Sequence, residues 1–152
     1  MSFSRKVKEE LSKQLTPSRH CQIAELAGII GMCGRIRISE DNRYKVYIHT
    51  ENIMVARKYY NLINSLFNTV IEVRVRSNSL YKKGTIYTVV VNDYIVAKKI
   101  LQVVKLLDNN GEINENLSVT HNIVIQNQCC KRAFLRGVFL ATGSISDPNK
   151  AY

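Results

Sequence analysis

The 152-residue chain is long enough for one well-buried domain and short for two, and its 45% hydrophobic residues with only 7 glycines and 2 prolines argue against a disordered protein. Lysine and arginine outnumber aspartate and glutamate by 22 to 12, and the formal net charge of +10 favours a polyanionic partner, either nucleic acid or an anionic membrane surface. No apolar run approaches the roughly 20 residues that cross a bilayer, so no membrane span is expected in it.

The N-terminal third predicts two helices of different kinds and then a hairpin. Apolar residues recur every four positions over residues 2–14, which indicates an amphipathic helix. The stretch 21–33 is apolar nearly all round, so we expect a helix that is buried on both faces. The alternating stretches 35–39 and 44–49 flank a polar turn and predict a β-hairpin.

The middle of the chain repeats this order. Residues 51–67 carry the apolar stripe of a helix, and two alternating stretches, 70–76 and 85–91, predict a second hairpin. Another apolar helix is predicted over 93–107, with Asn109-Asn110-Gly111 as its stop signal.

The last part of the chain predicts a polar connector at 109–128 and a helix at about 129–142. Strands that arrive as hairpins between helices indicate an α+β fold with an antiparallel sheet. We expect an N-terminal helix at 1–18, a first αββαββα unit at 19–108, the connector, and the start of a second unit at 129–152.

Two of the predicted helices are copies of one another. A displacement of 109 residues aligns Cys21 with Cys130, Ala24 with Ala133, Leu26 with Leu135, Gly28 with Gly137, Gly34 with Gly143 and Ile36 with Ile145. Glycine within a helix lets two backbones approach closely, and glycine at a helix end lets the chain turn sharply. We therefore predict a close helix pair whose interface comprises Leu26, Gly28, Gly34, Leu135, Gly137 and Gly143.

The segment Leu26–Gly34 (LAGIIGMCG) resembles the nine-residue LAGLIDADG signature of homing endonucleases, and Leu135–Gly143 (LRGVFLATG) resembles it more weakly. The resemblance implies a homing-endonuclease-like unit in which the two signature helices pack at the centre of a pseudo-twofold structure. It also implies that the sheets form a saddle that sits in the DNA major groove.

In that family the eighth signature residue is an aspartate that binds the divalent metal for DNA cleavage. Here the eighth positions are Cys33 and Thr142, and the sixth are Gly31 and Leu140. A thiol and a hydroxyl do not replace the carboxylates that hold Mg²⁺ against a phosphate. We therefore expect no enzyme activity, no catalytic residues and no metal or other cofactor, and an active endonuclease is the remote alternative.

A second resemblance, to the bacterial WhiA family, covers nearly the whole chain. It rests on Ser2–Leu11, His20–Leu26, Ala141–Ser146 and, most specifically, Cys129–Gly137. It implies a degenerate LAGLIDADG scaffold joined to a C-terminal helix-turn-helix domain, in a DNA-binding transcriptional regulator tied to sporulation and cell division. Such a protein would be cytoplasmic and nucleoid-associated. Because the chain stops at Tyr152, before a second sheet, we expect an N-terminal fragment of a protein about twice as long.

Strand alternation sorts basic side chains onto one face of the predicted sheet. The candidate DNA-binding residues are Arg35, Arg37, Lys45, Arg74 and Arg76 on this face, with Arg43, Lys82 and Lys83 at the loop tips. Val73 and Val75 are expected in the core, whereas both faces of the fourth strand are largely apolar. Arginine can pair with guanine in the major groove and lysine with phosphate. The alternative is an ordinary solvated face.

His20, Cys21, Cys129 and Cys130 fall at equivalent repeat positions near the starts of two helices. One nitrogen and three sulfur atoms could form a zinc site. The usual CxxC spacing is missing, and neighbours on a helix rarely point at one metal, so small apolar packing groups are the favoured interpretation. The N-terminus has no signal peptide, so the thiols are expected to be reduced in the cytoplasm.

DNA is the expected partner, and two alternatives stay open. This domain could mainly bind other regulatory proteins or dimerise, with DNA read by the helix-turn-helix of the longer protein. The helix at 129–142 could also pair with the helix at 21–33 of a second copy, as a homodimer, instead of folding back within one chain. No membrane partner is expected.

Overall fold

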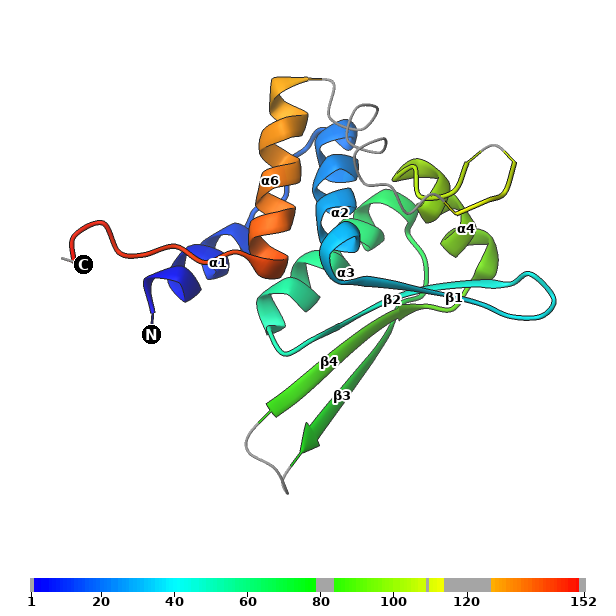
Figure 1. The fold of residues 1–152 in the computed structure, drawn as a ribbon, viewed down its shortest axis with the longest axis horizontal. Helices are drawn as coiled ribbons and strands as arrows, with labels where there is room; N and C mark the ends of the chain where they lie inside the picture. Colours follow the sequence, from blue (N-terminus) through cyan, green and yellow to red (C-terminus); the bar gives the residue numbers. More distant parts are fainter. Residues whose placement is uncertain (1, 79–83, 109, 114–126, 151–152) are drawn as a thin grey trace.

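The computed structural model describes residues 2–78, 84–108, 110–113 and 127–150. Within these residues it has the predicted α+β architecture, with five helices and one four-stranded antiparallel sheet. Figure 1 shows the helices gathered together, with one hairpin of the sheet projecting away from them.

The first two helices differ in their environment, as their sequences predict. Helix α1 (Phe3–Lys13) is amphipathic and begins at Ser2, whose side-chain oxygen accepts a hydrogen bond from the backbone N–H of Arg5 at 3.1 Å. Helix α2 (Arg19–Cys33) runs through the interior, where nine of its 15 residues are buried. Its apolar surroundings on both faces follow from its nearly uniform apolar sequence.

The sheet joins two hairpins through their inner strands. The strands are β1 (Gly34–Ile38), β2 (Tyr44–Thr50), β3 (Glu72–Asn78) and β4 (Gly84–Val91), in the order β1-β2-β4-β3. At the junction, Val46 pairs with Val91 and Ile48 pairs with Val89. These four side chains are at most 1% exposed, so the middle of one sheet face forms the floor of the core.

Two further helices contact this sheet. Helix α3 (Ile53–Phe67) connects β2 to β3, and helix α4 (Tyr94–Val103) follows β4. Asn52 and Asp93 begin these helices, and each side chain accepts a hydrogen bond from a backbone N–H in the first turn. Both helices contact β2 and β4, which places the core between the helices and the middle of the sheet.

Helix α4 is shorter than predicted. The helix expected over 93–107 ends at Val103, because Lys105 adopts a left-handed conformation with φ of 64°. The N–H of Leu106 then donates to the carbonyl of Leu101 at 2.9 Å, which satisfies the helix end without a glycine. The asparagine–glycine stop signal lies beyond this point, so the prediction was wrong here.

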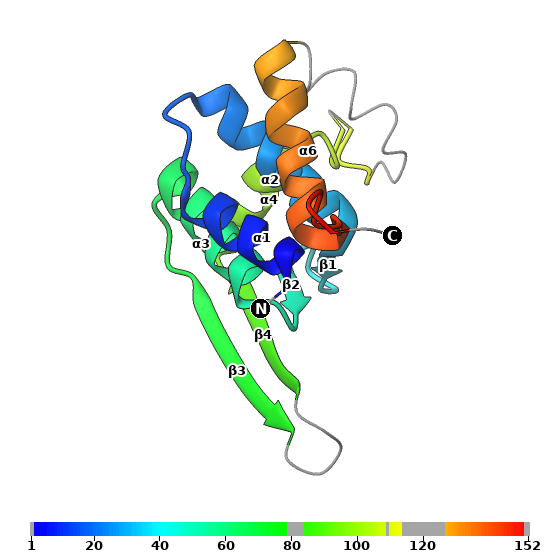
Figure 2. The ribbon, with the colours of Figure 1, turned by 90° about the vertical axis from the view of Figure 1, so that its left-hand side faces the viewer.

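The core prediction for β3 was also wrong. Val73 and Val75 are 49% and 62% exposed. The β3–β4 hairpin extends past the helices, as Figure 2 shows, so none of the described helices covers this part of the sheet. In contrast, Val89 on β4 lies under the helices and is 1% exposed.

Helix α6 (Gln128–Thr142) packs along α2 of the same chain, and the two lie side by side in Figures 1 and 2. The pair brings together the two copies of the internal repeat, 109 residues apart in sequence. Helix α6 also contacts α1 and α3, so the second copy is held by the body of the first unit.

Candidate functional site

The strand register gathers basic side chains on the sheet face opposite the core. Arg35 lies opposite Tyr47, and Arg37 lies opposite Lys45. Because residues directly opposite each other in antiparallel strands share a face, these four side chains lie together. The same register continues to β3, where Arg74 pairs with Thr88 of β4.

The register also shows which residues of β4 point to the core and which lie on the basic face. Val89 is directed to the core, whereas Thr88 and Val90 share the basic face because they pair with Arg74 and Glu72. Val90 is 2% exposed even so, so the long polar side chains around it cover its apolar surface.

Much of the positive charge on this face is not held in an ion pair with a described residue, although the charge of Lys45 helps to lower the pKa of Glu72. Arg35, Arg37, Lys45 and Arg76 make no ion pair with any residue that the structure describes. Arg37 and Lys45 are directly opposite each other, a like-charge arrangement that destabilises a strand pair. A bound anion would relieve that repulsion.

Two of the predicted DNA-binding arginines are partly neutralised. Arg74 donates to both carboxylate oxygens of Glu72 at 2.8 and 3.2 Å, and these hydrogen bonds are the main cause of the lowered pKa of Glu72. Arg43 Nε lies 3.0 Å from Asp41 Oδ2, and the guanidinium carbon Cζ of Arg43 lies 5.1 Å from the ring centre of Tyr94. Lys82 and Lys83 lie outside the described residues.

The basic face is hollowed at its centre. A pocket of about 90 Å³ is lined by Arg37, Lys45, Tyr47, His49, Arg74, Thr88 and Val90. Within it, His49 Nδ1 lies 2.7 Å from the hydroxyl of Thr88, and the rings of Tyr47 and His49 meet edge to face at 5.0 Å. These three residues were not among the predicted site residues, although strand alternation places Tyr47 and His49 on the same face as the arginines.

The helix pair is in contact at its backbone. A Cβ atom added to Gly28 would lie 2.5 Å from the carbonyl oxygen of Phe134, and one added to Gly137 would clash with the carbonyl oxygen of Glu25. Leu26 is fully buried, but its spacing of two residues from Gly28 directs it to another face of α2. Of these residues, Gly28 and Gly137 therefore lie where α2 and α6 meet.

The other predicted interface residues lie elsewhere. Leu135 is 63% exposed and faces away from α2, so its prediction as an interface residue was wrong. Gly34 and Gly143 end their helices, as the sequence predicted, and they do so in an extended conformation with φ of −72° and −77°. Glycine is required there because a Cβ atom would collide with the preceding helical turn, at Ile30 and Phe139 respectively.

The signature positions that bind metal in homing endonucleases carry neutral side chains. Burial raises the pKa of the Cys33 thiol to about 11, so it is protonated at neutral pH, and it donates to the carbonyl of Ile29 at 3.4 Å. The Thr142 hydroxyl donates to the carbonyl of Val138 at 3.1 Å. Neither side chain provides the anionic oxygen that Mg²⁺ prefers.

Sequence reasoning missed a buried charge cluster at the helix pair. Glu25 of α2 and Lys58 of α3 are 0% and 1% exposed at their side chains and lie 2.9 Å apart. Arg136 of α6 lies 3.7 Å from the second carboxylate oxygen. A single acidic residue within an otherwise apolar helix was the available signal, because a buried carboxylate needs a cationic partner.

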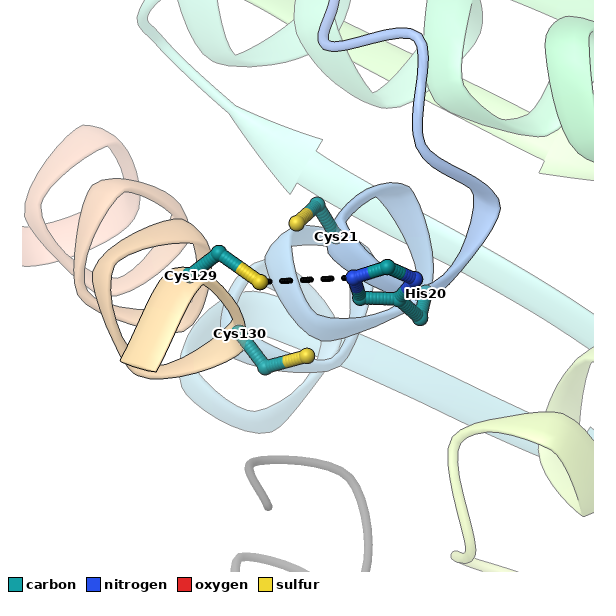
Figure 3. Close-up of side chains that lie close together, drawn as sticks. All are labelled: His20, Cys21, Cys129 and Cys130. Atoms are coloured by element: carbon teal, nitrogen blue, oxygen red, sulfur yellow. Dashed lines mark hydrogen bonds between the residues drawn. The ribbon is translucent and has the colours of Figure 1, made fainter. Parts of the chain in front are cut away.

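The histidine and cysteines that the repeat singled out lie together. Donor atoms of His20, Cys21, Cys129 and Cys130 are all within 4.8 Å of one another, at the adjoining starts of α2 and α6. Figure 3 shows the four side chains converging between the two helices. The expectation that sequence neighbours on a helix would diverge was therefore wrong for this set.

No helix among the described residues is both long and apolar enough to cross a membrane.

Comparison with known proteins identifies the scaffold. The family model described as the WhiA N-terminal LAGLIDADG-like domain matches residues 19–107, and that of the WhiA LAGLIDADG-like domain matches residues 131–152. The probable cell division protein WhiA of Lachnoclostridium phytofermentans is 43% identical over 153 residues, which cover 100% of this chain and 48% of the relative. That of Alkaliphilus oremlandii is 39% identical, with 100% and 48% covered. The chain thus spans about half the length of these curated relatives.

Two solved structures share the fold. Full-length DUF199/WhiA from Thermatoga maritima has a TM-score of 0.60 at 23% identity, over 97% of this chain and 42% of that chain. The N-terminal LAGLIDADG domain of DUF199/WhiA has a TM-score of 0.64 at 20% identity, over 99% of this chain and 63% of that chain. Since one family model alone covers more than half of its residues, the chain belongs to the WhiA family of LAGLIDADG-like proteins.

Proposed function

We propose that this chain is a DNA-binding part of a transcriptional regulator of cell division and sporulation, and that it binds DNA without cutting it. The observation that carries the proposal is a cluster of basic side chains on the outer sheet face that form no ion pair with a described residue: Arg35, Arg37, Lys45 and Arg76. The relatives' name, probable cell division protein, supports the cellular role.

The chemistry of this face suits a nucleic acid more than another anion. The basic residues follow strands across the sheet, and a phosphate backbone offers matching charges along a line. The pocket at the centre of the face adds the polar groups of Tyr47, His49 and Thr88, which could contact base edges or phosphates between the arginines. A twisted β-surface of this kind can enter the major groove.

The signature helices support binding without cleavage. Metal-assisted hydrolysis needs carboxylates to hold Mg²⁺ at the scissile phosphate. The two equivalent positions carry Cys33, whose thiol is neutral, and Thr142, whose hydroxyl is bonded within its own helix. We therefore infer that the scaffold is retained for its shape.

The test compares two double variants that lose the same charge. Arg35→Ala/Arg37→Ala removes two residues of the basic face, and Lys98→Ala/Lys99→Ala removes two exposed lysines of α4 on the helical side. Fluorescence anisotropy with duplex DNA over a range of salt concentrations gives affinity and salt dependence. The arginine variant should bind more weakly, with a salt slope smaller by about 0.9 for each lost phosphate contact.

The control should bind nearly as well as the unchanged chain. Equal losses in the two variants would mean that only net charge matters, and would contradict a defined DNA-binding face. Incubation of supercoiled plasmid with the pure chain and Mg²⁺ should leave the plasmid intact, and specific nicking would contradict the absence of cleavage.

A second candidate function is protein interaction, with DNA reading left to the remainder of the longer protein. Exposed apolar residues on α6 and just after this helix favour protein interaction, since Leu135 is 63% exposed and Ile145 is 48% exposed. In that case Leu135→Ser should abolish self-association or partner binding and leave DNA affinity unchanged. Light scattering that shows only monomer at high concentration would argue against a homodimer.

A further inference from the structure

The starts of α2 and α6 hold a compact set of one nitrogen and three sulfur donors. His20 and Cys21 lie in the first turn of α2, and Cys129 and Cys130 lie in the first turn of α6. The internal repeat relates His20 to Cys129 and Cys21 to Cys130, so each helix contributes two donors from equivalent positions. All four donor atoms lie within 4.8 Å of one another (Figure 3).

We propose that His20, Cys21, Cys129 and Cys130 bind one structural Zn²⁺ ion that joins the two signature helices. In a tetrahedral zinc site, Zn–S distances of about 2.3 Å and Zn–N distances of about 2.0–2.1 Å place the ligand atoms about 3.5–3.8 Å apart. His20 Nε2 and Cys129 Sγ are already 3.3 Å apart. The rest of the set needs to contract by only about 1 Å to reach this geometry.

The donor types select the ion. Three thiolates and one imidazole form a Cys₃His set, which is characteristic of structural zinc sites, whereas Mg²⁺ and Ca²⁺ prefer oxygen ligands. All four positions around the ion are filled by protein atoms, so the site leaves no place for a substrate. Its role is therefore to hold the fold together.

A second residue orients the imidazole. The Ser18 hydroxyl lies 2.8 Å from Nδ1 and 3.1 Å from Nε2 of His20, and Nε2 also lies 3.3 Å from Cys129 Sγ. Zinc-binding histidines usually bond through their other ring nitrogen to a nearby polar group, which fixes the ring. Ser18 therefore has the place of an outer-shell partner.

The helix ends favour the charge that such a site carries. A Zn²⁺ ion with three thiolates and a neutral imidazole has a net charge of −1. The N-terminus of a helix carries partial positive charge, and here two N-termini adjoin the site. Neither Ser18 nor Asn127, the residues before the two helices, makes a side-chain capping hydrogen bond, so a thiolate-rich site would supply the missing negative charge.

Simple apolar packing explains only half of the cluster. Cys21 and Cys130 are buried, at 5% and 3% exposed, and could act as small apolar groups. Cys129 and His20 are exposed, so burial cannot account for their position beside the other two. Metal binding accounts for all four residues.

The direct test is the metal content of the full 152-residue chain, purified with reductant and without chelator. Elemental analysis should find about one zinc ion per chain. The variants His20→Asn and Cys129→Ser change exposed residues and should fold, as circular dichroism will verify, but should lose most of the zinc. Cys33→Ser is the matched control, because it removes a thiol from the far end of the same helix α2 and should keep the ion.

Cobalt provides a readout of the ligands themselves. Co²⁺ added to the metal-free chain should give the absorption of a tetrahedral site and a thiolate-to-cobalt charge-transfer band that weakens in Cys129→Ser and not in Cys33→Ser. Zinc should also raise the melting temperature of the unchanged chain and the control more than that of Cys129→Ser. A zinc-free reduced chain, a disulfide among these cysteines in freshly purified protein, or equal zinc in all variants would overturn the proposal.

Discussion

Lys58 of α3 and Glu25 of α2 form an ion pair in the interior of the molecule, with 2.9 Å between the ammonium nitrogen and a carboxylate oxygen. Lys58 also donates to the carbonyl oxygens of Leu11 and Gln14 at the end of α1. Arg136 of α6 approaches the same carboxylate. One buried lysine and one buried glutamate thus connect four helices, and the backbone carbonyl of the same Glu25 faces Gly137 in the helix pair.

Removal of the lysine should destabilise the fold strongly. Lys58→Met leaves Glu25 buried with only Arg136 near it, and the loss of one partner from a buried ion pair typically costs about 3–5 kcal/mol. Burial already raises the pKa of Glu25, while Lys58 and Arg136 oppose that rise, so the variant should raise it further. Urea denaturation measures the change in the free energy of unfolding.

The double variant Glu25→Leu/Lys58→Met is the control for this effect. It removes both charges and should be more stable than Lys58→Met alone, because no uncompensated carboxylate remains. A double variant that is as unstable as the sum of the single variants would contradict an energetic coupling between the two residues.

The glycine contact predicts an unusual response to alanine. Within a helix, glycine to alanine ordinarily stabilises by about 0.5–1 kcal/mol. At Gly28 or Gly137 the added Cβ would meet the backbone of the partner helix, so Gly28→Ala and Gly137→Ala should each destabilise, by about 1–3 kcal/mol or more. Thermal unfolding of each variant provides the comparison, and a raised melting temperature in either one would show that the helices are not in backbone contact.

The two copies of the repeat should respond differently to the same substitution. Leu26 is fully buried, whereas Leu135, its repeat equivalent, is 63% exposed. Leu26→Ala should cost about 2–5 kcal/mol as a buried leucine. Leu135→Ala should change the stability of this chain by no more than about 0.5 kcal/mol. Equal costs, measured by urea denaturation, would contradict the burial difference.

The contrast between these leucines shows what the sequence can and cannot predict. Local periodicity and turn residues predicted the order of helices and strands, because each depends on neighbours along the chain. The repeat likewise predicted that α2 and α6 pair. Burial of Leu135 could not be predicted in this way, because the repeat shows which residues are equivalent and not what covers each copy.

In the candidate site, too, some features follow from local sequence patterns and others depend on how the chain packs. Strand alternation placed Arg35, Arg37 and Lys45 on one face because the side-chain period of a strand is fixed. Pairing of Arg74 with Glu72, two residues away on the same strand, depends on side-chain conformation and was not foreseen. Cys21 and Cys129 come together only because α2 and α6 approach closely. The spacing of residues within either helix does not determine that distance.

The ion pair on β3 distinguishes two arginines that were both predicted from the sequence to bind DNA. Arg76 makes no ion pair with a described residue, whereas Arg74 is held by Glu72. If this face binds DNA, Arg76→Ala should weaken binding more than Arg74→Ala. Glu72→Gln should strengthen binding, because it frees Arg74 and removes a negative charge from the face. Anisotropy titrations at one salt concentration suffice, and weaker binding by Glu72→Gln would contradict this order.

Alkaline pH should destabilise the chain through the thiol at the eighth signature position. Burial raises the pKa of Cys33 from 9.0 to about 11, so between these values the unfolded chain releases the thiol proton while the folded chain keeps it. The stabilising contribution is therefore complete below pH 9 and is lost as the pH rises towards 11. Burial also raises the pKa of Tyr59, which adds an effect of the same sign above pH 10. The free energy of unfolding, measured at each pH, should fall more steeply for the unchanged chain than for Cys33→Ala. Parallel curves would mean that Cys33 titrates alike in the folded and unfolded chain, and would contradict the raised pKa of this buried thiol.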